Sequence, residues 1–281
     1  MSSTSDEGSS TRLPFPVVAV GASAGGLDPL RTLLDHLPAR PGMAFVIITH
    51  HPAGETSLLP QILADDTRLP VRSAEEGAAL EANCIYVALP DYGWVLQAGT
   101  LVRQEPSGGA TSPGGSRSGP PHPIDTFFRS LASERASQAI GIILSGTGTD
   151  GTLGVKAIKS QSGMIIAQDP DTADFGGMPD SAIATGLVDY VMPPADMPAT
   201  LVGYVNAHTR SVNPSDARLS TIPEQTLREI LGQLNSRTGN DFSGYKHSTL
   251  LRRIERRMAV HQLDDPQAYL RQLRANPAEA D

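Results

Sequence analysis

The feature that most constrains the fold is a buried strand that passes through a glycine-rich turn into a helix. Four apolar residues, Val17 to Val20, run without a polar break, which is typical of a strand covered on both faces of a parallel sheet. Gly21, Gly25 and Gly26 then allow the chain to turn sharply, and leucines at helical spacing follow over 27–37. We therefore expect Ser23 to lie where the carboxyl end of a strand meets a helix N-terminus, a common ligand-binding position in α/β sheets.

Three kinds of glycine-rich turn between a strand and a helix have to be compared with this stretch. A dinucleotide-binding turn needs a second glycine where Ser23 stands, and a phosphate-binding loop of the Walker type needs a lysine that this stretch lacks. The pattern G-x-S-x-G over 21–25 does match a nucleophile elbow, which presents a serine hydroxyl at the end of a strand. A capping role for Ser23 remains open on this evidence alone.

The rest of the chain predicts an α/β domain followed by a small helical one. Further buried strands are expected over 43–49, 83–89, 139–144, 163–167 and 186–191, with a hairpin over 94–102 and helices between strands. This alternation predicts a doubly wound, mostly parallel sheet with helices on both faces. We expect a disordered leader over 1–12, a catalytic domain over 13–210, a linker over 211–221 and an all-α domain over 222–281, with helices over 224–237, 248–261 and 266–275.

Composition narrows the functional classes. The apolar runs are too short for a membrane span, and the serine-rich N-terminal stretch lacks the basic and apolar regions of a signal peptide. The lone Cys84 suits a buried thiol in a cytoplasmic protein, and the histidines have no zinc-type spacing, so we expect no metal and no cofactor. The first 220 residues are net negative and residues 221–275 net positive, which indicates two modules with different partners.

Three reactive groups follow three of the predicted strands: Ser23, His50 and Asp150. Strand ends of a parallel sheet meet along one edge, so these residues can come together. A serine hydroxyl becomes a nucleophile when an imidazole removes its proton, and a carboxylate fixes the imidazole tautomer. The order Ser, His, Asp disfavours an α/β-hydrolase of the usual kind, in which the histidine comes last.

Backbone N–H groups in the glycine-rich turns are candidates for oxyanion stabilisation. The candidate donors are Ala24, Gly25, Gly146, Thr147 and Gly148.

Each of these residues also has an ordinary structural interpretation. His50, or the adjacent His51, is compatible with a simple polar residue at a strand end, and Asp150 with a cap for the helix that follows Gly151. The occurrence of Ser23, His50 and Asp150 together at strand ends favours the catalytic interpretation.

These motifs resemble the CheB-type chemotaxis protein-glutamate methylesterases. The resemblance extends over about 17–208 and includes the turn over 21–26, Pro123-Ile-Asp-x-Phe-Phe and Leu144-Ser-Gly-Thr-Gly-Thr-Asp-Gly. It implies a Ser23–His50–Asp150 triad that hydrolyses γ-glutamyl methyl esters on chemotaxis receptors, with glutamine deamidation as a second activity. The chain departs from the family pattern at Thr49, where Gln is common, and at Thr147, where Met is usual.

The tail resembles the N-terminal helical domain of CheR-type receptor methyltransferases, on a match that begins at Leu234-Asn-Ser-Arg-Thr-Gly-Asn-Asp-Phe and ends at Arg257-Met. The chain ends before any AdoMet-binding unit and has no receiver domain before Ser23, so it resembles a fragment of a methylesterase–methyltransferase fusion. The resemblance implies that basic residues of the tail dock to an acidic receptor, with a solvated basic face as the ordinary alternative. These residues are Lys246, Arg252, Arg253, Arg256 and Arg257.

Two functional classes therefore stay open: a serine esterase and a catalytically weak receptor-binding adaptor. Nucleic acid is a poorer partner for the basic tail, because no aromatic platform accompanies the charges. The sequence leaves the receptor and the oligomeric state open.

Overall fold

The computed structural model describes residues 13–50, 58–88, 93–104, 122–212, 222–242, 244–276 and 279, excepting the side chains of 207–212, 248 and 252. The chain divides into two compact units, Met1–Ala199 and Thr200–Asp281. Among the described residues, no helix combines the length and the apolar character needed to cross a bilayer.

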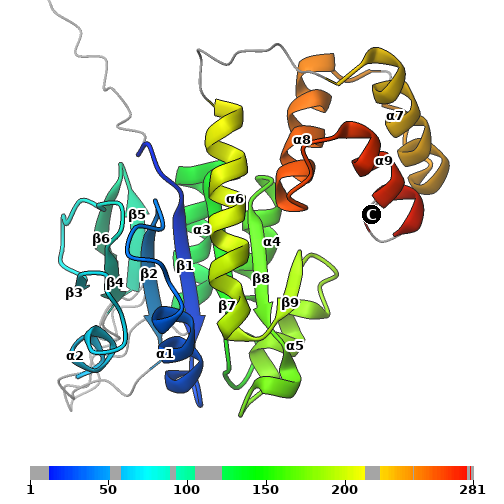
Figure 1. The fold of residues 1–281 in the computed structure, drawn as a ribbon. Coiled ribbons are helices and arrows are strands. Elements are labelled where there is room, and N and C mark those ends of the chain that lie inside the picture. Colours follow the sequence, from blue (N-terminus) through cyan, green and yellow to red (C-terminus); the bar gives the residue numbers. More distant parts are fainter. Residues whose placement is uncertain are drawn as a thin grey trace, which may run out of the picture. The chain divides into compact units, whose positions relative to one another are not determined.

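A seven-stranded, fully parallel sheet forms the centre of the first unit (Figure 1). Its strand order is β3-β4-β2-β1-β7-β8-β9, with β1 in the middle. The strands are β1 Val17–Ala22, β2 Ala44–Thr49, β3 Val71–Ser73, β4 Ile85–Ala88, β7 Ala139–Ile143, β8 Met164–Gln168 and β9 Tyr190–Met192. β1, β2, β4, β7 and β8 are buried along their whole length, as continuous apolar runs predict for parallel strands covered on both faces.

Helices cover both faces of this sheet, which confirms the predicted doubly wound architecture. The helices are α1 Leu27–Asp35, α2 Leu59–Ala64, α3 Pro123–Arg135, α4 Thr152–Ser160 and α5 Gly177–Ile183. Side chains alternate along β1: Val17 and Ala19 pack in the same cluster as Phe127 and Phe128 of α3. α1 lies on the opposite face of the sheet from α3 and α4 (Figure 1).

The predicted hairpin is also present, as β5 Gly93–Gln97 and β6 Thr100–Gln104. Its two turn residues, Ala98 and Gly99, both have positive φ (49° and 76°), as a tight two-residue hairpin turn requires. The hairpin packs against α3 rather than joining the main sheet.

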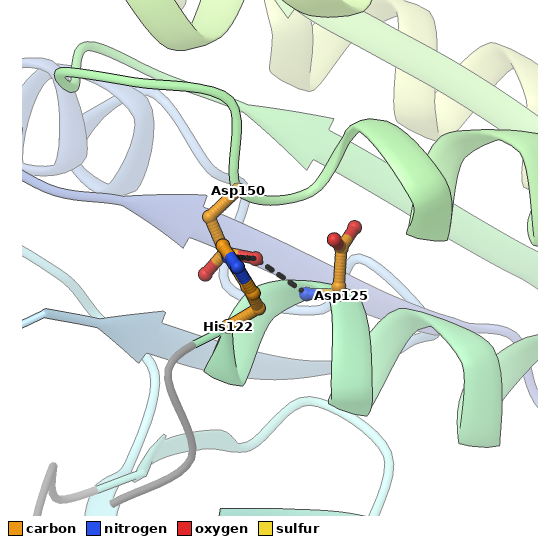
Figure 2. A group of neighbouring side chains, drawn as sticks. All are labelled: His122, Asp125 and Asp150. Carbon is orange, nitrogen blue, oxygen red and sulfur yellow. Dashed lines mark hydrogen bonds and ion pairs between the residues drawn. The ribbon is translucent and has the colours of Figure 1, made fainter.

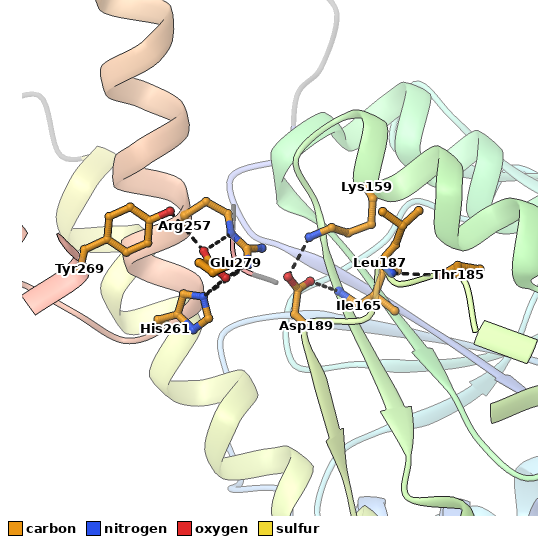
Figure 3. A network of polar contacts seen from close by, with 9 residues as sticks. All are labelled: Lys159, Ile165, Thr185, Leu187, Asp189, Arg257, His261, Tyr269 and Glu279. Atoms are coloured by element: carbon orange, nitrogen blue, oxygen red, sulfur yellow. Dashed lines mark hydrogen bonds and ion pairs between the residues drawn. The ribbon is translucent and has the colours of Figure 1, made fainter. Parts of the chain in front are cut away.

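The structure differs from the sequence-based prediction at the edges of the sheet. β3 was not predicted, and only the last two residues of the strand expected over 186–191 belong to a strand, β9. Gly186 has φ +70°, which interrupts extended backbone. The carboxylate of Asp189 accepts hydrogen bonds from the Ile165 N–H at 2.8 Å and from Lys159 Nζ at 2.7 Å, so a side chain replaces a strand carbonyl there (Figure 3).

The second unit contains three helices at the predicted positions: α7 Glu224–Thr238, α8 His247–Val260 and α9 Pro266–Ala275. A small core of buried side chains holds them together: Ile222, Leu227, Ile230, Ile254, Met258, Tyr269, Leu270 and Leu273. Asp265 caps α9 by accepting hydrogen bonds from the N–H groups of Gln267 and Ala268. A further helix, α6 Met197–Val212, runs two residues into the predicted linker.

The buried carboxylate of Glu279 accepts hydrogen bonds from side chains of α8, of α9 and of the turn between them (Figure 3). Glu279, whose side chain is 3% exposed, accepts from Arg257 at 2.6 and 2.8 Å, from His261 Nε2 at 2.7 Å and from the Tyr269 hydroxyl at 3.2 Å. Burial alone would raise the pKa of Glu279, but the hydrogen bonds from His261 and Arg257 outweigh it and lower the pKa to about 2.

We expect Glu279→Gln to destabilise the three-helix core at neutral pH, by roughly 2–3 kcal/mol. Because the folded pKa lies below that of an unfolded glutamate, this contribution is complete above about pH 4.5 and is lost as the pH falls towards 2. Hydrogen exchange of α8 and α9 amides in the full chain, measured at several pH values, would test it.

Glu229→Gln is the matched control for this experiment, because Glu229 is a partly exposed carboxylate that meets Arg274 at 3.4 Å. Its loss is expected to cost less than about 0.5 kcal/mol at any pH. Equal protection loss in the two variants, or a Glu279 effect that does not shrink in acid, would contradict the assigned role of Glu279.

Candidate active site

The register of the central strands brings Ser23 and His50 to the same edge of the sheet. Ala22 at the end of β1 pairs with Thr49 at the end of β2, so Ser23 and His50 are the next residues of two neighbouring strands. On the other side, β1 pairs with β7, and the Ser23 N–H donates to the Ser145 carbonyl at 3.0 Å just beyond β7. Asp150 lies in the loop that continues from there to α4.

His50 and Asp150 form a direct pair. His50 Nε2 lies 3.1 Å from Asp150 Oδ2, and the aspartate side chain is only 4% exposed, against 34% for the histidine. Ser23 is half-buried in the turn beside them. The structure therefore brings the predicted imidazole and carboxylate together and places the serine at the adjoining strand end. His51 lies outside the described residues, so the choice between the two histidines rests on the contact made by His50.

Asp150 is held by backbone N–H groups from two segments. Its carboxylate accepts hydrogen bonds from Ile124 and Asp125, each at 3.0 Å, in the first turn of α3, and from its neighbour Gly151 at 2.8 Å. Asp150 thus satisfies N–H groups at the start of α3, whereas the residue that precedes α4 is Gly151, with φ +93°. The interpretation of Asp150 as a simple cap for the following helix is therefore wrong.

These contacts also control the charge of Asp150. Burial by itself raises the pKa of a carboxyl group, but here the hydrogen bond from His50 and those from Asp125 and Ile124 outweigh burial and lower the pKa of Asp150. The carboxylate therefore stays ionised at neutral pH, as a group that orients an imidazolium must.

Two further titratable residues lie close to Asp150 (Figure 2). Ligand atoms of His122, Asp125 and Asp150 lie within 4.8 Å of one another, a spacing compatible with a metal ion. However, both oxygens of Asp150 already accept two bonds each, and Asp125 Oδ1 accepts the Gly154 N–H at 2.7 Å. Burial also raises the pKa of the Asp125 carboxyl above its usual range. Hydrogen bonds account for this cluster, and we assign no metal to it.

The structure divides the five candidate oxyanion donors into two sets. The Gly146 N–H donates to the Phe175 carbonyl at 2.9 Å, so the prediction that Gly146 serves as a donor is wrong. The sequence did not show that the segment before α5 folds back over this loop. No protein acceptor in the described part of the chain takes the N–H groups of Ala24, Gly25, Thr147 or Gly148, and Thr147 and Gly148 are exposed. These four remain candidates.

Two supporting residues were not singled out from the sequence. Ser145 and Gln168 connect the ends of β7 and β8, through a hydrogen bond of 2.9 Å from the Ser145 N–H to Gln168 Oε1. Ser145 belongs to the motif Leu144-Ser-Gly-Thr-Gly-Thr-Asp-Gly, so a signal was present for it, but its partner Gln168 comes from a distant segment. Thr49, the departure from the family pattern before His50, is buried, and its hydroxyl meets no hydrogen-bond partner among the described residues.

The predicted basic face of the tail is only partly a free surface. Arg256 is buried, with its guanidinium carbon 4.2 Å from the ring centre of Tyr204, and Arg257 is paired with Glu279. Lys246 and Arg253 are exposed, and the Arg252 side chain lies outside the described residues. The prediction of five solvent-facing cations therefore needs correction for Arg256 and Arg257, which serve the packing of their own unit.

Comparison with known proteins identifies both parts of the chain. Residues 18–201 match the CheB methylesterase family, and residues 225–281 match the all-alpha domain of CheR methyltransferases. The chain belongs to the CheB methylesterase family. This CheB domain contains the paired His50 and Asp150 and the Ser23 turn.

Curated proteins similar to this chain include a named methylesterase and an uncharacterized protein. A protein-glutamate methylesterase/protein-glutamine glutaminase of Moorella thermoacetica is 35% identical over 202 residues, covering 67% of this chain and 44% of the relative. An uncharacterized 104.1 kDa protein of Rhodobacter capsulatus is 33% identical over 232 residues, covering 75% of this chain and 23% of its own length. The chain thus spans half or less of these relatives.

The solved structure of the CheB methylesterase catalytic domain from Thermotoga maritima has the same fold. It superposes with a TM-score of 0.60 at 30% sequence identity, and the match covers 68% of this chain and 98% of that domain. The CheB fold of the first unit is therefore supported by sequence and by structure.

Proposed function

We propose that the chain is a serine hydrolase that removes methyl groups from γ-glutamyl methyl esters of chemotaxis receptors, and that Ser23, His50 and Asp150 are its catalytic residues. The observation that carries the proposal is the 3.1 Å contact between His50 and the buried Asp150 next to the Ser23 turn. Membership of the CheB family and the names of its curated relatives support the choice of substrate.

The contact geometry suggests how the imidazole acts. Because Nε2 of His50 donates to Asp150, the proton of the neutral ring is on Nε2 and Nδ1 is the free base. Nδ1 accepts the proton of the Ser23 hydroxyl as its oxygen attacks the ester carbonyl. The negatively charged Asp150 stabilises the imidazolium that results. Backbone N–H groups from the set Ala24, Gly25, Thr147 and Gly148 then hold the developing oxyanion.

The remaining steps follow from the same groups. Collapse of the tetrahedral intermediate breaks the bond to the methoxy group, which leaves as methanol with the proton from His50. Water, deprotonated by His50, attacks the glutamyl ester on Ser23 and releases the glutamate carboxylate and the serine. A glutamine amide would pass through the same acyl intermediate with ammonia as the leaving group, which accounts for a deamidase activity at one site.

A reactive-serine probe separates this proposal from the adaptor alternative. A fluorophosphonate is expected to label the native chain, with the adduct mapped by mass spectrometry to Ser23, and His50→Ala is expected to abolish labelling. An unlabelled native chain, or an adduct on another serine, would contradict the proposed nucleophile.

We also propose that the exposed cations of the tail assist capture of an acidic receptor. Lys246 and Arg253 are the exposed members of the predicted docking face among the described side chains. Exposed charges of this kind act over about 8–10 Å at physiological salt and mainly accelerate association.

We therefore expect the double charge reversal Lys246→Glu/Arg253→Glu to weaken receptor binding severalfold at low salt, and hardly at all at high salt. Hydrolysis of a small ester should be unchanged, since neither residue belongs to the catalytic site. Binding measured over a salt series for the native and variant chains tests this. Superimposable curves would show that these cations form only a solvated face.

A further inference from the structure

Ser145 is a fully buried serine that connects the nucleophile turn to two other segments. It is 0% exposed and follows β7 by two residues. Its carbonyl accepts the Ser23 N–H at 3.0 Å, and its own N–H donates to Gln168 Oε1 at 2.9 Å. Its complete burial excludes it as a nucleophile, so its hydroxyl needs another explanation.

The hydroxyl of Ser145 makes specific contacts with the backbone of the Ser23 turn. Oγ lies 3.0 Å from the Ala24 carbonyl oxygen and accepts the Phe175 N–H at 3.0 Å, with the Phe175 carbonyl farther away at 3.3 Å. A hydroxyl has one proton to donate, and Ala24 offers the shorter acceptor distance. Ser145 therefore links the residue after the nucleophile to the segment before α5.

This contact fixes the orientation of one peptide unit. In a trans peptide the C=O and N–H bonds point in opposite directions, so drawing the Ala24 carbonyl towards the buried Ser145 turns the Gly25 N–H away from it. Among the described residues, no protein acceptor takes that N–H. Gly25 itself has φ +68°, and a Cβ there would stand 2.9 Å from Ser145 Oγ and 2.8 Å from Phe175, so the turn packs tightly on Ser145.

We propose that Ser145 is a positioning residue for catalysis: its hydroxyl orients the Ala24–Gly25 peptide so that the Gly25 N–H is available to the oxyanion formed at Ser23. This inference rests on the proposed serine-hydrolase function. Ser145 does not touch the substrate. It acts by holding a backbone donor ready before the reaction, which is the condition under which such donors stabilise a transition state strongly.

The test compares Ser145→Ala, Ser145→Cys and the matched control Ser160→Ala, whose hydroxyl binds the Ala157 carbonyl on the exposed side of α4. Loss of a fully formed oxyanion donor costs about 10²–10³ in kcat. A donor that is present but poorly oriented should cost less. We expect Ser145→Ala to lower kcat on a p-nitrophenyl ester by about ten- to a hundredfold with KM within about twofold. Cysteine, which has the same shape but a larger and more weakly donating sulfur, should fall between serine and alanine.

Fluorophosphonate labelling of Ser23 provides the second measurement, because its transition state also develops negative charge on oxygen. The labelling rate should fall in the same order, Ser, Cys, Ala, while Ser160→Ala keeps the native rate. A role in packing alone would lower the melting temperature without this parallel loss. If the alanine variant fails to fold, kcat and the labelling rate of the cysteine variant test the proposal.

The two proposals fail differently. A native chain that reacts with the probe at Ser23, together with unchanged kcat in the folded Ala or Cys variant, would overturn the role of Ser145 and leave the hydrolase intact. A native chain that does not react would overturn both.

Discussion

Ser23→Ala is expected to abolish methyl ester hydrolysis while leaving the fold intact. Loss of the nucleophile in a serine hydrolase lowers kcat on the order of a millionfold. The turn itself depends on backbone contacts, the Ser23 N–H to Ser145 and the Gly26 N–H to the Ser23 carbonyl, which alanine preserves. Hydrolysis of a methyl ester and thermal unfolding, measured on the same preparation, test both parts of the expectation.

Ser160→Ala is the matched control, since this exposed serine lies at the end of α4 and its hydroxyl donates to the Ala157 carbonyl at 2.7 Å. It should keep native activity. Hydrolysis by Ser23→Ala near the native rate would show that Ser23 is only a turn residue.

Asp150→Asn is expected to lower kcat roughly ten-thousandfold, because the imidazole would adopt the wrong tautomer. In the native site Asp150 accepts a hydrogen bond from His50 Nε2, which leaves Nδ1 free as the base. An asparagine NH₂ in that place would donate to Nε2 and move the ring proton to Nδ1. The N–H group of Ile124, which donates to the same oxygen as His50, would also face the amide nitrogen, costing about 1–3 kcal/mol of stability.

The control for this variant is His122→Ala. His122 is 59% exposed and its Nδ1 lies 3.8 Å from Asp150, beyond hydrogen-bond distance, so its removal should leave kcat nearly unchanged. A loss below tenfold in Asp150→Asn would mean that Asp150 acts only at the start of α3. A larger loss of kcat in His122→Ala than in His50→Ala would show that His122, and not His50, is the catalytic base.

The positions of the three proposed catalytic residues at one sheet edge could be predicted because they depend on local patterns and on the geometry of parallel sheets. The continuous apolar runs over 17–20, 44–48 and 139–144 identify β1, β2 and β7, and parallel register then brings their carboxyl ends together. The apolar periodicity of α7, α8 and α9 is similarly local.

Contacts between distant segments could not be predicted in this way. The Gly146 N–H looked available in the sequence but is taken by Phe175, because the chain between β8 and α5 folds back over the loop. Arg257 looked like a surface cation, but its charge is paired with Glu279, 22 residues later. In both cases the partner lies on another segment of the chain. Residue spacing in the sequence does not show where that segment will lie in the fold.

Methanol release from a receptor that carries labelled methyl esters on its glutamates tests the central proposal most directly. The native chain should release methanol at a rate proportional to its concentration, and Ser23→Ala and His50→Ala should release none above background. Release that persists in both variants, or its absence from the native chain, would contradict the assignment of Ser23, His50 and Asp150 as a methylesterase triad.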